Sequence, residues 1–291
     1  MNLLPEVLIG GIANAGLYAL LGLSVVIIFR ATRVLNFASG QYMLLGSYLV
    51  YWLLVQEHLG YVLSFALSFI LMAAIGALTY IGVIRPVKGR PLFVPVILTF
   101  GISLILTSLM DIIWGSQNDT LPSPIALETY HITATAYITT PEIISVCVAI
   151  AAMLLFVGFD RYTKVGIQVR AASEDVLLAS QTGIRVDLLF MIAWALASIV
   201  ALLAGLSYAY QYTVTPTSTD LGILVLAPVV IASFDSLSGV VVGSVVVGLL
   251  SNAVSTYING NAGEAVVYGA ILAVLIIRPR GFFGTQAARR L

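Results

Sequence analysis

The sequence predicts an all-α polytopic membrane protein with about eight transmembrane helices, one of them short or re-entrant. We expect its N-terminus outside and its C-terminus in the cytoplasm. Hydrophobic residues make up 60% of the 291 residues and charged residues only 9%, whereas soluble domains have about 25% charged residues. The apolar residues also form long runs, and the positive charges gather in a few clusters between those runs.

Nine apolar runs follow one another, and we interpret residues 1–291 as a single transmembrane domain. Most runs are long enough to cross the hydrocarbon core, which takes about 20 residues of α-helix. The run 221–234 is short and contains Pro228, so we expect half a span or a re-entrant segment there. The runs are 7–29, 35–55, 61–84, 92–113, 142–159, 188–210, 221–234, 239–258 and 263–277.

Positive charges orient the chain, because cytoplasmic loops of membrane proteins are enriched in Lys and Arg. If the N-terminus is outside, all 13 Lys and Arg residues fall on the cytoplasmic side. This path requires an odd number of crossings between residues 211 and 278. Either 221–234 crosses fully and 239–258 returns, or only one of the three late runs crosses. The cytoplasmic clusters are 30–34, 85–91, 160–187 and the tail from Arg278.

The main outer segment is the loop 114–141, which is rich in Thr, Ser and Pro. The alternating pattern around Tyr130–Tyr137 predicts a short strand or a hairpin. The loop is either a docking surface for an external partner or a passive cap over the helices.

The longest charged stretch is the cytoplasmic loop 160–187, and it carries the signals of a short helix. Ser173 is expected to cap the helix, and Glu174 and Asp175 to place negative charge in its first turn. Gly183 is expected to close it in a left-handed conformation. Two interpretations remain open: the helix docks onto another protein, or it lies on the bilayer surface.

Small residues recur at close to every fourth position in two of the runs. Such stripes allow helices to approach closely, and we interpret them as packing surfaces. The alternative is that the helices slide past one another along these stripes during transport. The first stripe is Ala193, Ala197, Ala201, Gly205 and Ala209, and the second is Gly239, Gly243 and Gly248.

Polar residues inside the runs are few, and no acidic or basic residue lies at mid-membrane. Buried polar groups must face other helices or an aqueous path, because hydrocarbon offers no hydrogen bonds. A carrier driven by protons or sodium usually has a buried ionisable residue, so its absence argues against that class. The polar residues are Asn14, Asn36, Ser39, Gln41, Thr99, Ser103 and Asn252.

Motifs of catalysis are missing from the sequence. Neither Lys88 nor Lys164 lies in a P-loop, so the chain is not expected to hydrolyse ATP by that route. Two histidines and a single cysteine provide no metal-site spacing, and we expect no cofactor and no metal. The net charge of zero implies no nucleic-acid partner. We therefore do not expect an intramembrane enzyme.

Four stretches in order resemble one family, the inner-membrane permeases of ABC importers for branched-chain amino acids. RVLNFASGQYMLLGSYL (33–49) is similar to the family's signature turn and helix, and TKVGIQVRAASEDVLLASQTGIRVD (163–187) to its cytoplasmic loop. LAPVVIASFDSLSGVVVGSVVVGLL (226–250) resembles its glycine-rich late segment, and IIRPRGFFG (276–284) its ending.

The resemblance implies a multi-pass protein of the cytoplasmic membrane of a prokaryote. Its partners would be a related second permease, two cytoplasmic ATPase subunits and an extracytoplasmic solute-binding protein. Residues 171–183 would form the coupling helix on the ATPase, and the solute path would pass near Asn36 and Gly40. The residues implied in the path are Asn36, Ser39, Gly40, Gln41 and Thr99, and those implied in coupling are Arg170, Ser173, Glu174, Asp175, Leu177, Leu178 and Gly183.

Two alternatives to an amino-acid importer subunit stay open from the sequence. One is a permease of the same family that carries urea or short amides. The other is a self-sufficient secondary carrier or channel, which would transport solute without partner ATPases.

Overall fold

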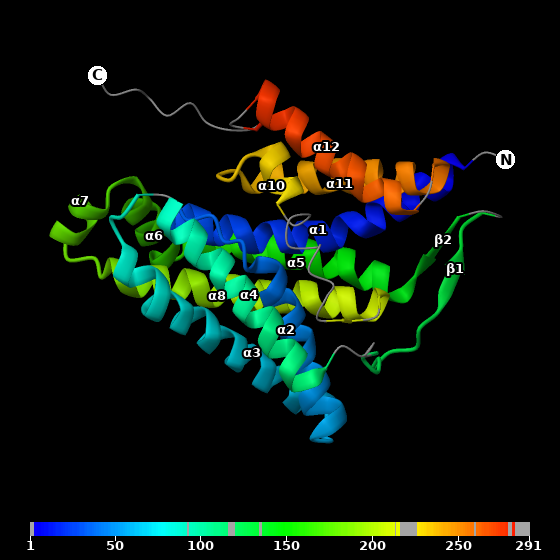
Figure 1. The fold of residues 1–291 in the computed structure, drawn as a ribbon, viewed down its shortest axis with the longest axis horizontal. Helices are drawn as coiled ribbons and strands as arrows, with labels where there is room; N and C mark the ends of the chain where they lie inside the picture. Colours follow the sequence, from blue (N-terminus) through cyan, green and yellow to red (C-terminus); the bar gives the residue numbers. More distant parts are fainter. Residues whose placement is uncertain are drawn as a thin grey trace.

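The computed structural model describes residues 3–91, 93–115, 120–133, 136–212, 214–215, 226–258, 260–278 and 281–282. Almost every element in these ranges is a helix (Figure 1). The α-helices are α1 (Leu4–Thr32), α2 (Ser39–Tyr51), α3 (Tyr61–Thr79), α4 (Phe93–Trp114), α5 (Thr140–Tyr162), α6 (Lys164–Glu174), α7 (Val176–Gln181), α8 (Val186–Gln211), α10 (Ala227–Ala232), α11 (Leu237–Tyr257) and α12 (Gly260–Ile277). Shorter pieces are the π-helices η1 (Trp52–Gln56) and η2 (Tyr80–Ile84), the 3-10 helix η3 (Arg85–Val87), and the strands β1 (Thr129–His131) and β2 (Tyr137–Thr139).

Six helical segments within the described residues are long and apolar enough to cross a membrane. This agrees with a polytopic membrane protein. The segment 39–56 continues from α2 into a π-helical turn, so neither piece alone reaches the length of a span. The six segments are Leu4–Thr32, Tyr61–Val87, Phe93–Trp114, Thr140–Tyr162, Val186–Gln211 and Leu237–Tyr257.

Helix α1 forms the centre of the bundle. In its most apolar 18-residue window 78% of the residues are buried, against 17% in the windows of α4 and α5. A helix that is apolar on all faces belongs in the interior, and α5, α8 and α11 each pack along α1 (Figure 1).

The small-residue stripes lie where helices approach one another. A Cβ atom on Gly205 of α8 would overlap the Met43 carbonyl oxygen of α2 and lie 2.7 Å from the Ser47 hydroxyl. Ala197 and Ala201 of the same stripe are 1% exposed. In the second stripe, a Cβ on Gly243 would overlap the Pro228 carbonyl oxygen. A Cβ on Gly239 would lie 2.9 Å from the Ala232 Cβ. Whether any of these contacts slides during transport stays a prediction.

The loop 114–141 contains the hairpin that its alternation predicts. Strands β1 and β2 are antiparallel, and Tyr130 pairs with Ile138. The strand β2 leads directly into α5, whose start is a capping box between Thr139 and Glu142. The Tyr130 hydroxyl donates a hydrogen bond of 2.9 Å to Glu128, and this bond raises the pKa of Tyr130.

Of the run 221–234, the structure describes residues 226–234, and Ala227–Ala232 of these are helical. Six residues of α-helix rise about 9 Å, far less than the hydrocarbon thickness of about 30 Å. Pro228 lies at the start of this helix, where its missing N–H costs little. Residues 221–225 of the run lie outside the described residues, as do Arg280, Arg289 and Arg290 of the tail.

Candidate functional site

The break between α1 and α2 brings together most of the residues expected on the solute path. Helix α1 ends where Arg33 adopts a left-handed conformation with φ of 56°. Helix α2 begins at Ser39, so Gly40 lies in its first turn. The irregular backbone therefore precedes Gly40, at residues 33–38.

Hydrogen bonds hold this break closed onto α4. The Thr99 hydroxyl accepts a hydrogen bond from the backbone N–H of Phe37 (3.3 Å) and lies 3.2 Å from the Leu35 carbonyl oxygen. The Asn36 side-chain oxygen accepts from the backbone N–H of Ala38 (3.0 Å), and Ser39 donates to the Asn36 carbonyl (3.1 Å). These bonds satisfy polar groups that the broken helix would otherwise leave unpaired in an apolar interior.

Two polar atoms at the break have no protein partner. Asn36 and Gln41 are 1% and 3% exposed, yet the Asn36 amide nitrogen and the Gln41 side-chain oxygen make no hydrogen bond. The first N–H groups of α2, which belong to Ser39, Gly40 and Gln41, also lack intrahelical acceptors. The break therefore offers hydrogen-bond donors and one acceptor in a buried, uncharged place.

The charged loop 160–187 folds as two helices, and this changes the expected caps. Thr163 caps α6, and its hydroxyl accepts a hydrogen bond from the Gly166 N–H (3.0 Å). Ser173 lies in the last turn of α6 and donates to the Arg170 carbonyl (2.8 Å), so the expectation that it caps a helix is wrong. The cap of α7 is Asp175, whose carboxylate accepts from the Leu178 N–H (2.9 Å). Gly183 has the predicted left-handed backbone, with φ of 84°.

Helix α7 lies at one end of the molecule (Figure 1), and its leucine side chains are exposed. Leu177 is 67% exposed and Leu178 is 59% exposed. Glu174, the last residue of α6, is also exposed. Only one residue of α7, Ala179, is buried against the rest of the chain.

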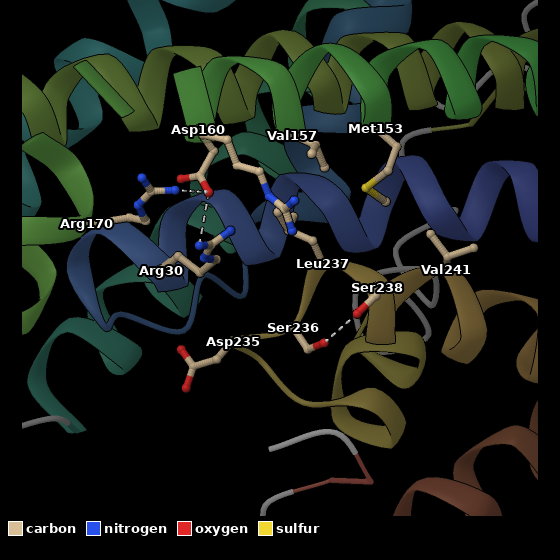
Figure 2. Close-up of a pocket in the computed structure, with 11 residues that line it drawn as sticks. Arg30, Met153, Val157, Asp160, Arg170, Asp235, Ser236, Leu237, Ser238 and Val241 are labelled. Carbon is tan, nitrogen blue, oxygen red and sulfur yellow. Dashed lines mark hydrogen bonds and ion pairs between the residues drawn. The ribbon is translucent and has the colours of Figure 1, made fainter. Parts of the chain in front are cut away.

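A buried aspartate joins the charged loop 160–187 to the central helix. Asp160, at the end of α5, is 7% exposed and accepts from Arg30 of α1 (3.2 Å) and from Arg170 of α6 (3.3 Å). Figure 2 shows the two guanidinium groups converging on this carboxylate. A second ion pair joins Arg33 to Asp235, in the turn before α11.

These ion pairs were not predicted from the sequence. The partners Arg30 and Asp160 are 130 residues apart, and Arg33 and Asp235 are 202 residues apart. The one available signal was the position of Asp160 at the end of an apolar run, where a lone carboxylate needs a cation.

Within the described part of the chain, no group of three or more His, Cys, Asp or Glu side chains could hold a metal ion. The polar atoms at the α1–α2 break are amide and hydroxyl groups and backbone N–H groups. Such an arrangement can donate hydrogen bonds to a small polar solute and accept them from it.

Comparison with known proteins places the chain among transport permeases. The family model described as "Branched-chain amino acid transport system / permease component" matches residues 7–276. The high-affinity branched-chain amino acid transport system permease protein LivH of Escherichia coli is 25% identical over 300 residues, with 97% of this chain and 96% of the relative covered.

Two further relatives come from other organisms. The probable branched-chain amino acid transport permease protein LivH of Methanocaldococcus jannaschii is 26% identical over 298 residues, which cover 96% of this chain and 92% of the relative. The permease protein BraD of Pseudomonas aeruginosa is 23% identical over 300 residues, which cover 98% and 97%. The chain is a multi-pass membrane protein, and it belongs to the family of permease components of branched-chain amino acid transport systems.

Proposed function

We propose that this permease forms half of the translocation path of an ATP-driven importer for branched-chain or other small amino acids. Its partners are a related second permease, two cytoplasmic ATPase subunits and an extracytoplasmic solute-binding protein. The chain itself carries no ATPase site, and the energy comes from the separate subunits. Family membership and the sequence's lack of a P-loop support the assignment of ATP hydrolysis to separate subunits.

The proposed topology has eight transmembrane helices, with the N-terminus outside and the C-terminus in the cytoplasm. Six are the long apolar segments, and the others are α2 continued by η1 and the shorter α12. Tyr212 at the end of α8 bonds to Asn14 of α1, whereas Asp235 before α11 pairs with Arg33 beyond the other end of α1. The chain thus returns along the bundle between residues 212 and 235. In the proposed topology the chain therefore also crosses the membrane between α8 and α11, although α10 itself is too short to span. Together with the eight helices this makes nine crossings, and an odd number places the two termini on opposite sides.

The proposed solute path passes the α1–α2 break, near Asn36, Ser39, Gly40, Gln41 and Thr99. An amino acid carries a carboxylate and an ammonium group, and it needs acceptors and donors together. The N-terminus of α2 and the Asn36 amide nitrogen suit the carboxylate, since helix N-termini favour anions. The Gln41 side-chain oxygen suits the ammonium group. These unpaired, buried polar atoms are the observation that carries the proposal.

The proposed coupling surface is centred on α7. The exposed Leu177 and Leu178 suit an apolar groove on an ATPase subunit, and the Asp175 cap and Gly183 define the ends of the helix. Arg170 and the buried Asp160 connect this surface to α1. A displacement of α7 by the ATPase would therefore be transmitted through these ion pairs to α1, which leads into the α1–α2 break.

Replacing Gln41 by leucine tests the solute path, because leucine keeps most of the side-chain volume but lacks the unpaired oxygen. We expect the KM for amino-acid uptake to rise about tenfold, the equivalent of one hydrogen bond to a charged group. The measurement is uptake of labelled leucine into vesicles that contain the whole importer. Thr107→Val is the control, because the Thr107 hydroxyl donates to the Ser103 carbonyl of its own helix.

An unchanged KM in Gln41→Leu would remove this residue from the path. The substrate class is checked in the same vesicles by competition. Unlabelled isoleucine or valine should suppress leucine uptake, whereas urea and acetamide should not. Competition by the amides alone would contradict the amino-acid assignment.

A further inference from the structure

A groove runs between α5 and α11 along the surface of α1. Both helices pack on α1, and the small residues Ala15, Gly16 and Ala19 of α1 line the groove between them. Two cavities of about 430 and 380 Å³ lie along this groove, and both are lined by Met153 and Val241. They therefore form one continuous groove.

One end of the groove is basic. It is lined by Arg30, Arg161 and Arg170, together with Asp160 and Asp235. Asp160 already pairs with two of these arginines, and Asp235 pairs with Arg33. No ion pair holds Arg161 in the described ranges of the chain. With Arg33 included, four arginines face two aspartates, which leaves a surplus of two positive charges. All four arginines belong to segments assigned to the cytoplasmic side.

The rest of the groove is apolar. Its walls are Val146, Ile150 and Leu154 of α5 and Val245 of α11, and Ile12 of α1 lies at the far end. Met153 lies seven residues before Asp160 on α5, about 10 Å along the helix axis. Figure 2 shows the charged residues Arg30, Asp160 and Arg170 toward one end and Met153 with Val241 toward the other.

We propose that this groove binds an anionic phospholipid of the cytoplasmic leaflet. The phosphate would lie against Arg161 and the outward-facing nitrogens of Arg30 and Arg170, and one acyl chain would follow the apolar part of the groove. Basic pockets between transmembrane helices on the cytoplasmic side recognise anionic headgroups in this way. The N-terminus of α11, capped by Ser236, adds partial positive charge at the same end. Since both carboxylates are already paired, the groove offers little to the ammonium group of a zwitterionic lipid.

The experiment is a titration of the purified, delipidated full-length chain in detergent, with bound lipids counted by native mass spectrometry. Phosphatidylglycerol is expected to bind more tightly than phosphatidylethanolamine. Arg161→Gln should weaken phosphatidylglycerol binding about fivefold, as the loss of one basic residue near the headgroup predicts. Lys164→Gln is the matched control, because Lys164 is a nearby exposed cation that does not line the groove.

A second variant tests the apolar half without touching a charge. Ile150 is 57% exposed, so Ile150→Trp fills the groove from its open side at little risk to folding. It should weaken phosphatidylglycerol binding and leave glycerol phosphate binding unchanged.

Three results would overturn the proposal. Equal binding of the two lipids would remove the anion specificity, and glycerol phosphate binding as tight as that of phosphatidylglycerol would identify a site for a free phosphate compound. Unchanged lipid binding in Arg161→Gln, together with loss of co-purifying ATPase, would identify the basic end as a protein-docking surface instead.

Discussion

Gly205→Ala is expected to destabilise the protein by about 1–3 kcal/mol, the usual cost of an overpacked interior. The new methyl group would overlap the Met43 carbonyl oxygen, which is backbone of α2 and cannot move without shifting that helix. Alanine is the better helix former by about 1 kcal/mol, so steric overlap must outweigh a favourable change in propensity. The measurement is the thermal unfolding midpoint of the detergent-solubilised protein.

Gly158→Ala is the matched control for this prediction. Gly158 lies in α5, and a Cβ atom there would have no neighbour within 4 Å. The control should unfold at the same temperature as the unchanged protein or slightly above it. If both variants unfold at the same temperature, α2 and α8 are not in the close contact that the structure describes.

Leu177→Glu combined with Leu178→Glu is expected to reduce ATP-driven uptake at least tenfold while the protein still inserts and folds. Both side chains are more than half exposed, so they contribute little to the stability of the chain itself. Two charges in an apolar groove of the ATPase would be desolvated without a partner, at a cost of several kcal/mol. The measurements are uptake in vesicles and the amount of ATPase that co-purifies.

The control Gln181→Glu adds a charge to α7 without removing an apolar contact, and it should retain most of the uptake. Substituting Asp175 would be a poor test of docking, because its carboxylate caps α7 and its loss would also unfold that helix. Full uptake in the double leucine variant would show that α7 is not the coupling surface.

Local patterns were sufficient to predict most of the fold. The apolar runs predicted the long helices because about 20 apolar residues in sequence have few alternatives to a transmembrane helix. The four-residue spacing of Gly205 with Ala201 and Ala197 places them on one helix face. The left-handed Gly183 and the outer hairpin around Tyr130 also follow from local backbone preferences.

Features set by distant contacts could not be predicted. Ser173 and Asp175 are both good caps, and the choice depends on Thr163 starting a separate helix earlier in the loop. The α1–α2 break precedes Gly40 because the hydroxyl of Thr99, more than 60 residues along the chain, accepts a hydrogen bond from the backbone N–H of Phe37 in the break. The pairing of Asp160 with Arg30 likewise depends on how α5 packs on α1, which no spacing in the sequence encodes.

In the proposed function, this permease works only with separate ATPase subunits. The most direct measurement is purification of the tagged chain from its native membrane, reconstitution of all co-purifying proteins in liposomes, and assay of amino-acid uptake with and without ATP. We expect a second permease and a P-loop ATPase in stoichiometric amounts, and accumulation of solute only when ATP is hydrolysed. A chain that purifies alone and moves solute without ATP would contradict the account and identify a secondary carrier or channel.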